Sequence, residues 1–173
     1  MRPLVAWLCL VSAAASAAAL SPEEEKALAA RAGDYLRAAS QGEADKFLQM
    51  THPALHGLFG GKGPFEEATR AALQALAGKQ VVTSVAVGRV DGLHAVGKEE
   101  LCFVPMRVTT RVGNQWTQAD SYYIAVRAVG GSEWRFIDGA GLRKRPAVLR
   151  QLFPDLPKDV VPPRNEVTIK TVK

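Results

Sequence analysis

Three strand-like runs that follow one another between residues 100 and 139 constrain the fold of this chain more than any other feature. The runs are separated by the pairs Gly113-Asn114 and Gly130-Gly131. Such pairs between alternating apolar stretches are typical of two-residue β-hairpin turns. The stretch therefore predicts three consecutive antiparallel strands.

The turn positions also predict the register of these strands. A two-residue turn at Gly113-Asn114 places Arg107 opposite Asp120, and the second turn places Tyr123 opposite Asp138. The first hairpin then also contains the pairs Phe103–Ile124, Leu101–Val126 and Arg111–Trp116. Ionic, apolar and cation–π partners of this kind stabilise cross-strand pairs, so they favour this register.

The strands predict two different faces, because successive side chains of a strand point to opposite sides of the sheet. The expected core face carries Cys102, Val104, Met106, Tyr123, Ala125, Trp134, Phe136 and Asp138. The other face carries Leu101, Phe103, Tyr122, Ile124, Val126 and Ile137. A large apolar patch on an outer face needs a cover, which here is either a second subunit or the chain's own C-terminal tail.

Residues 1–19 have the layout of a cleavable secretory signal. Arg2 precedes the apolar run LVAWLCLVSAAASAAA, which ends in Ala17-Ala18-Ala19 before a helix start at Ser21. An uncleaved membrane anchor, the alternative, needs about 20 strongly apolar residues. We therefore expect an exported protein, periplasmic or secreted after cleavage. Cys102 is then its single cysteine, and its place on the core face predicts a small buried side chain.

Helical patterns precede the strands. The first is expected from Pro22 to about Ser40, the second over 43–50 and the third over 64–78. The third is expected to bury Phe65, Ala68, Ala72 and Leu76. Strands are expected over 81–90 and 93–96, and helices followed by strands predict an α+β domain with helices on one face of an antiparallel sheet. This domain is assigned to residues 20–141.

The tail, residues 142–173, is basic and rich in proline. It has eight basic and three acidic residues, whereas residues 20–141 have 13 basic and 14 acidic ones. Residues 145–153 predict a short helix with one apolar side that covers part of the Phe103–Ile124 face. Beyond Pro157 we expect an extended, mobile segment that engages an anionic or protein partner.

The order of elements and the closing run Trp134-Arg135-Phe136-Ile137-Asp138-Gly139 resemble the nuclear transport factor 2-like superfamily, including exported bacterial members of unknown role. The resemblance covers roughly Ser21 to Gly139. It implies a cone-shaped, cystatin-like fold, with a strongly bent sheet and a pocket between its concave face and the helices. That superfamily contains isomerases, dehydratases, small-molecule binders and protein-binding members, so the fold does not select an activity.

A cone of this kind would collect several candidate residues. The expected pocket residues are Tyr35, Met106, Tyr123, Trp134, Phe136 and Asp138. An apolar pocket raises the pKa of a carboxyl group, so Tyr123 and Asp138, with His52 at the mouth, are the candidate catalytic residues of an isomerase or dehydratase. The alternatives are a buried Tyr123–Asp138 pair without a catalytic role, Asp138 as part of the strand's exit turn, and a hydrogen-bonded His52 that ends a helix.

We expect neither a metal nor a cofactor. His52 and His56 are four residues apart, but Pro53 and Gly57 argue against a regular helix there, and no further ligand is near in the sequence. The glycine-rich run at 60–63 follows no strand and lacks a Walker pattern, so it predicts a loop.

Without a nucleophile–base pair, a binding module is favoured over an enzyme. Its expected partner is a small apolar ligand or an envelope protein, and a homodimer is also considered. The expected partner surface is Phe103, Tyr122, Ile124, Arg143, Lys144 and Arg145. The basic tail favours a weak contact with anionic membrane surfaces. Nucleic acid is not expected, because Phe153 is the tail's only aromatic residue.

Overall fold

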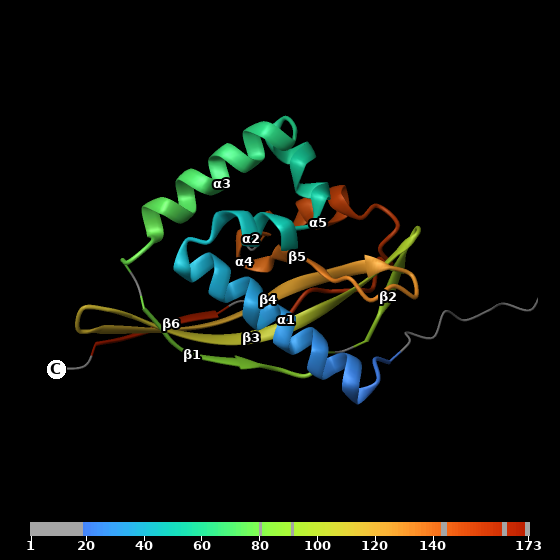
Figure 1. Ribbon diagram of the computed structural model, residues 1–173. Helices are drawn as coiled ribbons and strands as arrows, with labels where there is room; N and C mark the ends of the chain where they lie inside the picture. Colours follow the sequence, from blue (N-terminus) through green and yellow to red (C-terminus); the bar gives the residue numbers. More distant parts are fainter. Residues whose placement is uncertain (1–18, 80, 91, 143–144, 164–165, 172–173) are drawn as a thin grey trace, which may run out of the picture.

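The computed structural model describes residues 19–79, 81–90, 92–142, 145–163 and 166–171. Its helices are α1 (Pro22–Gln41), α2 (Ala44–Met50), the 3₁₀ helix η1 (Pro53–Phe59), α3 (Lys62–Leu76), α4 (Gly139–Leu142) and α5 (Pro146–Leu152). Its strands are β1 (Val81–Val87), β2 (His94–Val96), β3 (Glu99–Val112), β4 (Gln115–Ala128), β5 (Arg135–Asp138) and β6 (Glu166–Thr171). The predicted α+β class is confirmed (Figure 1).

All strand pairs of this sheet are antiparallel, and its main path runs in the order β1-β3-β4-β5. The short strand β2 pairs with β3, and β6 pairs with β4. Because β3 occupies one edge of β4 along its whole length, β5 and β6 share the other edge. Strand β5 pairs with Tyr123–Val126, and β6 pairs with Gln115–Asp120.

The predicted register of both hairpins is confirmed. Arg107 lies opposite Asp120 and donates two hydrogen bonds to its carboxylate, at 2.6 and 2.9 Å. Tyr123 lies opposite Asp138. Gly113 has a φ of 58°, which only glycine adopts readily and which a two-residue hairpin turn requires.

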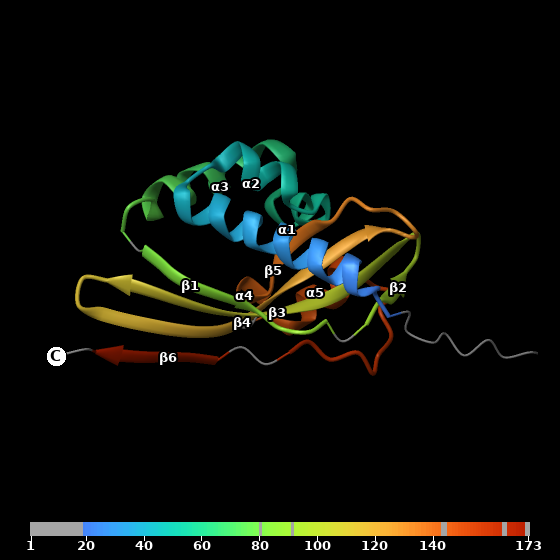
Figure 2. The same cartoon turned by 60° about the horizontal axis from the view of Figure 1, so that its bottom comes forward.

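Helices α1, α2 and α3 lie on one face of the sheet (Figures 1 and 2). The main core forms between α1 and this face. It contains the predicted core-face side chains Cys102, Val104, Met106, Tyr123, Ala125, Trp134 and Phe136, together with Leu28, Ala32 and Tyr35 of α1. Burial raises the pKa of the Cys102 thiol to about 12, so this cysteine is the unreactive packing residue that was predicted.

The second face of the sheet is covered by the chain's own tail. Leu142 of α4, Leu149 of α5, and Phe153 and Leu156 beyond it form one buried cluster with the apolar side chains of this face. The predicted helix at 145–153 and its docking are therefore confirmed. The predicted extended backbone at the end of the tail is confirmed for residues 166–171. The sequence did not predict their pairing with β4, which is possible because β5 is too short to use the whole edge of that strand.

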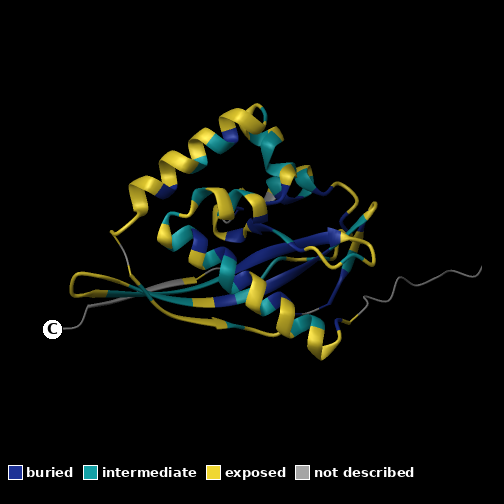
Figure 3. Cartoon of the chain, in the orientation of Figure 1, coloured by how far each residue is buried: buried dark blue, intermediate teal, exposed yellow. Residues whose placement is uncertain are grey.

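The predicted inward stripe of the third helix is mostly wrong. Phe65 is buried as expected, but the second anchor is Leu73, whereas Ala68, Ala72 and Leu76 are exposed. Most of α3 is exposed in Figure 3. The helix packs against η1 and α2 rather than flat on the sheet, so a different side faces inward.

The leader at 1–18 and the basic residues Arg143 and Lys144 lie outside the described residues. Among the helices that the structure describes, none combines the length and the apolar character needed to cross a membrane.

Candidate functional site

The space between the sheet and α1 is filled by side chains. Met106, Tyr123, Trp134 and Phe136 are all at most 5% exposed and belong to the main core. These four side chains therefore form packed core between the sheet and α1, instead of the open pocket expected there. They pack against one another and against α1, as the near-complete filling of protein interiors requires.

A cleft of about 610 Å³ lies instead beside β5, between η1 and α3 on one side and α4 and α5 on the other. Its wall is predominantly apolar, with Phe47, Leu55, Leu58, Phe59, Phe65, Ile137, Leu142 and Val148. Its polar side chains are Tyr35, Thr51, Thr69, Asp138, Arg145 and Gln151. Tyr35 and Asp138 are the two predicted pocket residues that line it.

Tyr35 has its hydroxyl proton committed to a hydrogen-bond chain. The Thr51 hydroxyl donates to the carbonyl of Phe47 at 2.8 Å, so its single proton is used. Tyr35, whose oxygen lies 3.2 Å from Thr51 Oγ1, must then be the donor in that bond. Burial also raises the pKa of Tyr35. Its oxygen can therefore accept a hydrogen bond from a ligand, but it does not act as a proton donor or as a base near neutral pH.

Asp138 faces the cleft at the point where β5 becomes α4. Its Oδ1 accepts a hydrogen bond from the backbone N–H of Ala140 at 2.8 Å, which confirms the exit-turn role considered for it. The side chain is exposed to the cleft, while the surrounding walls remove much of its bulk water. That desolvation raises the pKa of Asp138, and the bond from Ala140 offsets part of the effect.

Gly139 keeps this turn tight. A Cβ at Gly139 would clash with the ring of Tyr122, so only glycine lets the chain pass this close to the sheet.

Arg145 lies at the mouth of the cleft, immediately before α5. The residue is exposed, and none of the carboxylates in the described part of the chain forms an ion pair with it. The sequence placed Arg145 on a partner surface, whereas the structure places it on the cleft.

His52 does not line this cleft. Its Nδ1 accepts a hydrogen bond from the backbone N–H of Ala54 at 3.2 Å, so Nε2 carries the proton and donates to Glu99 Oε1 at 3.1 Å. Burial lowers the pKa of His52, although Glu99 partly opposes this shift. The predicted hydrogen-bonded histidine is confirmed, but His52 caps the start of η1 and does not end α2, whose C-cap is Thr51. Its ring is not free for acid–base chemistry in the cleft.

The predicted partner surface is largely covered. Phe103, Tyr122 and Ile124 are at most 4% exposed and lie under the tail, so they form no open surface. Of the two covers that the sequence allowed for this face, the structure shows the tail.

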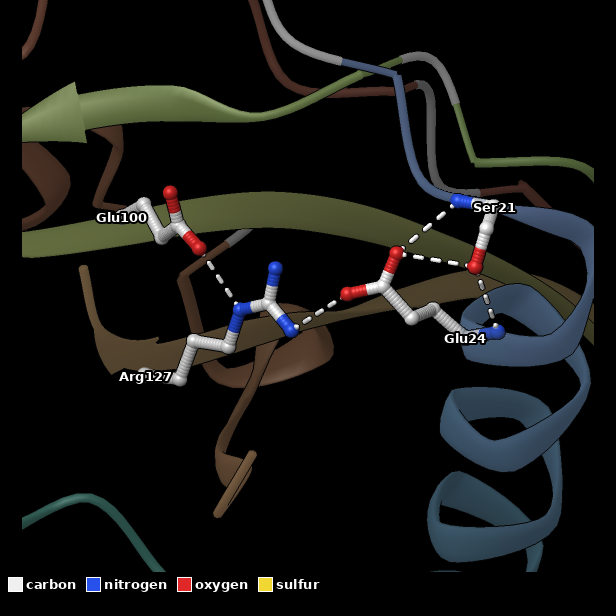
Figure 4. Close-up of polar contacts among 4 residues, drawn as sticks. All are labelled: Ser21, Glu24, Glu100 and Arg127. Carbon is white, nitrogen blue, oxygen red and sulfur yellow. Dashed lines mark hydrogen bonds and ion pairs between the residues drawn. The ribbon is translucent and has the colours of Figure 1, made fainter. Parts of the chain in front are cut away.

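A polar network that the sequence did not predict fixes the start of α1 to the sheet (Figure 4). The guanidinium of Arg127 donates to Glu100 at 2.7 Å and to Glu24 at 3.0 Å, and it stacks over the ring of Trp134 at 4.4 Å. Glu24 in turn accepts bonds from the backbone and side chain of Ser21. The contact between Ser21 and Glu24 could have been predicted from the Ser-x-x-Glu spacing of a capping box. The contact with Arg127 could not, because it depends on the position of β4 beside α1 in the folded chain.

No cluster of histidine, cysteine and carboxylate side chains within the described ranges is suited to hold a metal ion. Comparisons with protein-family models, curated proteins and solved structures gave no match. The cleft is therefore interpreted from its own geometry.

Proposed function

We propose that this chain is a non-catalytic binding protein whose cleft beside β5 takes a small, largely apolar molecule. The observation that carries the proposal is the cleft itself. At about 610 Å³ it falls within the roughly 300–1,000 Å³ of ligand pockets, and its apolar wall contains a few polar groups that can orient a ligand. An envelope protein remains the other partner class that the tail's charge favours.

The catalytic alternative has less support. An isomerase or dehydratase would need Tyr123, Asp138 and His52 around one substrate. Asp138 lines the cleft, but Tyr123 is packed in the main core and both ring nitrogens of His52 are hydrogen-bonded to the protein. Proton transfer in such a reaction needs both an acid and a base near the substrate, and Asp138 is only one such group.

The wider proposal is that the protein is exported through its N-terminal leader and has a nuclear transport factor 2-like fold. The order of helices before strands and the closing β5 support the fold. A homodimer and a weak contact of the basic tail with anionic membrane surfaces belong to the same proposal. No nucleic-acid partner is proposed.

Binding in the cleft can be tested by NMR with methyl-labelled protein and 1-octanol as the probe. We expect saturable shifts for the methyl groups of Leu55, Leu58, Ile137 and Val148. Gly57 lines the cleft, and a Cβ added there meets no atom within 4 Å, so we expect the ring of Gly57→Phe to occupy cleft space and abolish the shifts. Gly63 also has open space but lies outside the cleft, so Gly63→Phe is the matched control. The proposal fails if neither 1-octanol nor octanoate gives saturable shifts at these methyl groups.

A further inference from the structure

The cleft is polarised from base to mouth. At its base Tyr35, Ile137 and Phe65 are at most 4% exposed. The exposed lining residues at its mouth include Arg145, Gln151 and Asp138, together with Phe59. A ligand that fills this space would therefore have its apolar part inside and any polar head at the mouth.

Among the described residues, the mouth offers one cation for that head. Arg145 is the single basic side chain among the described residues that line the cleft, and no carboxylate in the described chain is paired with it. A guanidinium presents a planar pair of N–H donors that matches the two oxygens of a carboxylate. It is thus suited to an anion with a flat, two-oxygen head.

Arg150, the nearest described basic neighbour on α5, is not available for this role. Its guanidinium donates to the backbone carbonyls of Leu156, Pro157, Lys158 and Val160 and so fixes the loop after α5. Of these two described arginines, Arg145 is therefore the one available to the anionic head.

Asp138 limits the charge that the cleft accepts. It is the single acidic side chain among the described lining residues, and within that part of the chain no basic side chain is bonded to it. With one basic and one acidic side chain among the described lining residues, the cleft suits a ligand with a single negative charge better than a dianionic phosphate.

We propose that the cleft binds an amphiphilic monocarboxylate, with its hydrocarbon part against the apolar base and its carboxylate paired with Arg145 at the mouth. This inference rests on the proposed function and names the ligand class for the same site. Tyr35 and Asp138 then contribute hydrogen-bonding groups along the wall, and Arg145 sets the preference for the acid.

The test compares octanoate with 1-octanol, which have the same chain length and differ in the head group, by calorimetric or NMR titration at pH 8 in lipid-free buffer. A charge-assisted bond at a partly exposed site should make octanoate bind about tenfold more tightly than 1-octanol. Arg145→Gln should reduce octanoate to the affinity of 1-octanol and change the 1-octanol affinity less than twofold. Arg31→Gln, which removes the same charge from the exposed side of α1, should leave the tenfold preference intact.

Two outcomes separate failure of this inference from failure of the proposed function. Equal binding of octanoate and 1-octanol by the unmodified protein, or an octanoate preference that survives Arg145→Gln, overturns the carboxylate assignment and leaves an apolar site in place. Absence of binding by both probes overturns the proposed function as well. Because Arg145 is exposed, Arg145→Gln should keep the melting temperature of the unmodified protein, which shows that the fold is intact.

Discussion

His52 connects four segments of the chain through its ring and its backbone. Its ring bonds Ala54 and Glu99, its backbone N–H donates to the carbonyl of Phe136 at 2.9 Å, and the ring packs against Phe153 at 5.8 Å between centroids. The His-Pro pair predicts a break after the second helix, and in the structure His52 caps the start of the next helix, η1. Its bond to Glu99 cannot be predicted locally, because the two residues are 47 positions apart.

His52 should make the protein less stable in mild acid. Burial lowers the folded-state pKa of His52 below its ordinary 6.5, so the unfolded state binds the proton more readily. The stabilisation is complete above pH 6.5 and falls as the pH drops through 6.5 toward the folded pKa. Besides burial, the charges of Glu99, Arg135 and His56 act on the imidazole.

His52→Asn should flatten that dependence, because asparagine can still accept the bond from the Ala54 N–H but does not titrate. We expect the loss of unfolding free energy between pH 8 and pH 5.5, measured by urea denaturation, to be smaller in the variant than in the unmodified protein. His94→Asn keeps His52 and the groups that act on its imidazole, so it should keep the original dependence. An equal pH dependence in the unmodified protein and His52→Asn would contradict this assignment.

Single elements differ in how well the sequence predicts them. The β3–β4 hairpin was predicted residue by residue, because the Gly113-Asn114 turn fixes its register and each face repeats every two residues. The inward side of α3 was predicted mostly wrongly, because a helix rich in alanine has several sides of similar apolarity and its actual contacts are η1 and α2. The β6 pairing was missed for a related reason, since it depends on the edge of β4 that β5 leaves open.

Helix α5 should contribute strongly to stability, although it has only seven residues. Leu149 is 3% exposed in the cluster that covers the second sheet face, so Leu149→Ala should cost about 2–5 kcal/mol of unfolding free energy. Leu76→Ala on α3 is the matched control. Leu76 is 49% exposed, and its loss should change stability by about 0.5 kcal/mol or less. If urea denaturation gives equal small effects for the two variants, α5 does not hold the tail on the sheet.

At the scale of the whole molecule, the candidate site was the least predictable feature. The sequence predicted a pocket between the sheet and the helices, because Tyr35, Tyr123 and Asp138 were expected on that side of the sheet. The structure confirms that these residues lie on the same side. Large aromatic side chains fill the centre, so the open space moves to the end of β5, where η1, α3, α4 and α5 meet. Two segments far apart in the sequence, η1 with α3 and α4 with α5, build the cleft. Arg145 reaches it only because the tail folds back.

The start of the folded domain sets a limit on where a leader can be removed. Leu20 is 8% exposed and belongs to the main core. Ser21 caps α1 and is hydrogen-bonded to Glu24. Glu24 in turn accepts a hydrogen bond from Arg127 of β4. Ala19 is exposed. Cleavage after Ala17, Ala18 or Ala19 would leave these contacts in place, whereas cleavage beyond Leu20 would remove part of the core.

We therefore expect a chain that begins at Leu20 to melt at the same temperature as one that begins at Ala19. A chain that begins at Pro22 loses about 1.5–3 kcal/mol from the buried Leu20 side chain and about 1 kcal/mol from the N-cap. Its melting temperature should fall by about 5 °C or more. Scanning calorimetry of the three chains measures this difference, and mass spectrometry of protein recovered from the cell envelope should find a mature start between Ala18 and Leu20. Equal melting temperatures of all three chains would show that the domain begins after Ser21, and an intact Met1 in the cytoplasmic fraction would overturn export.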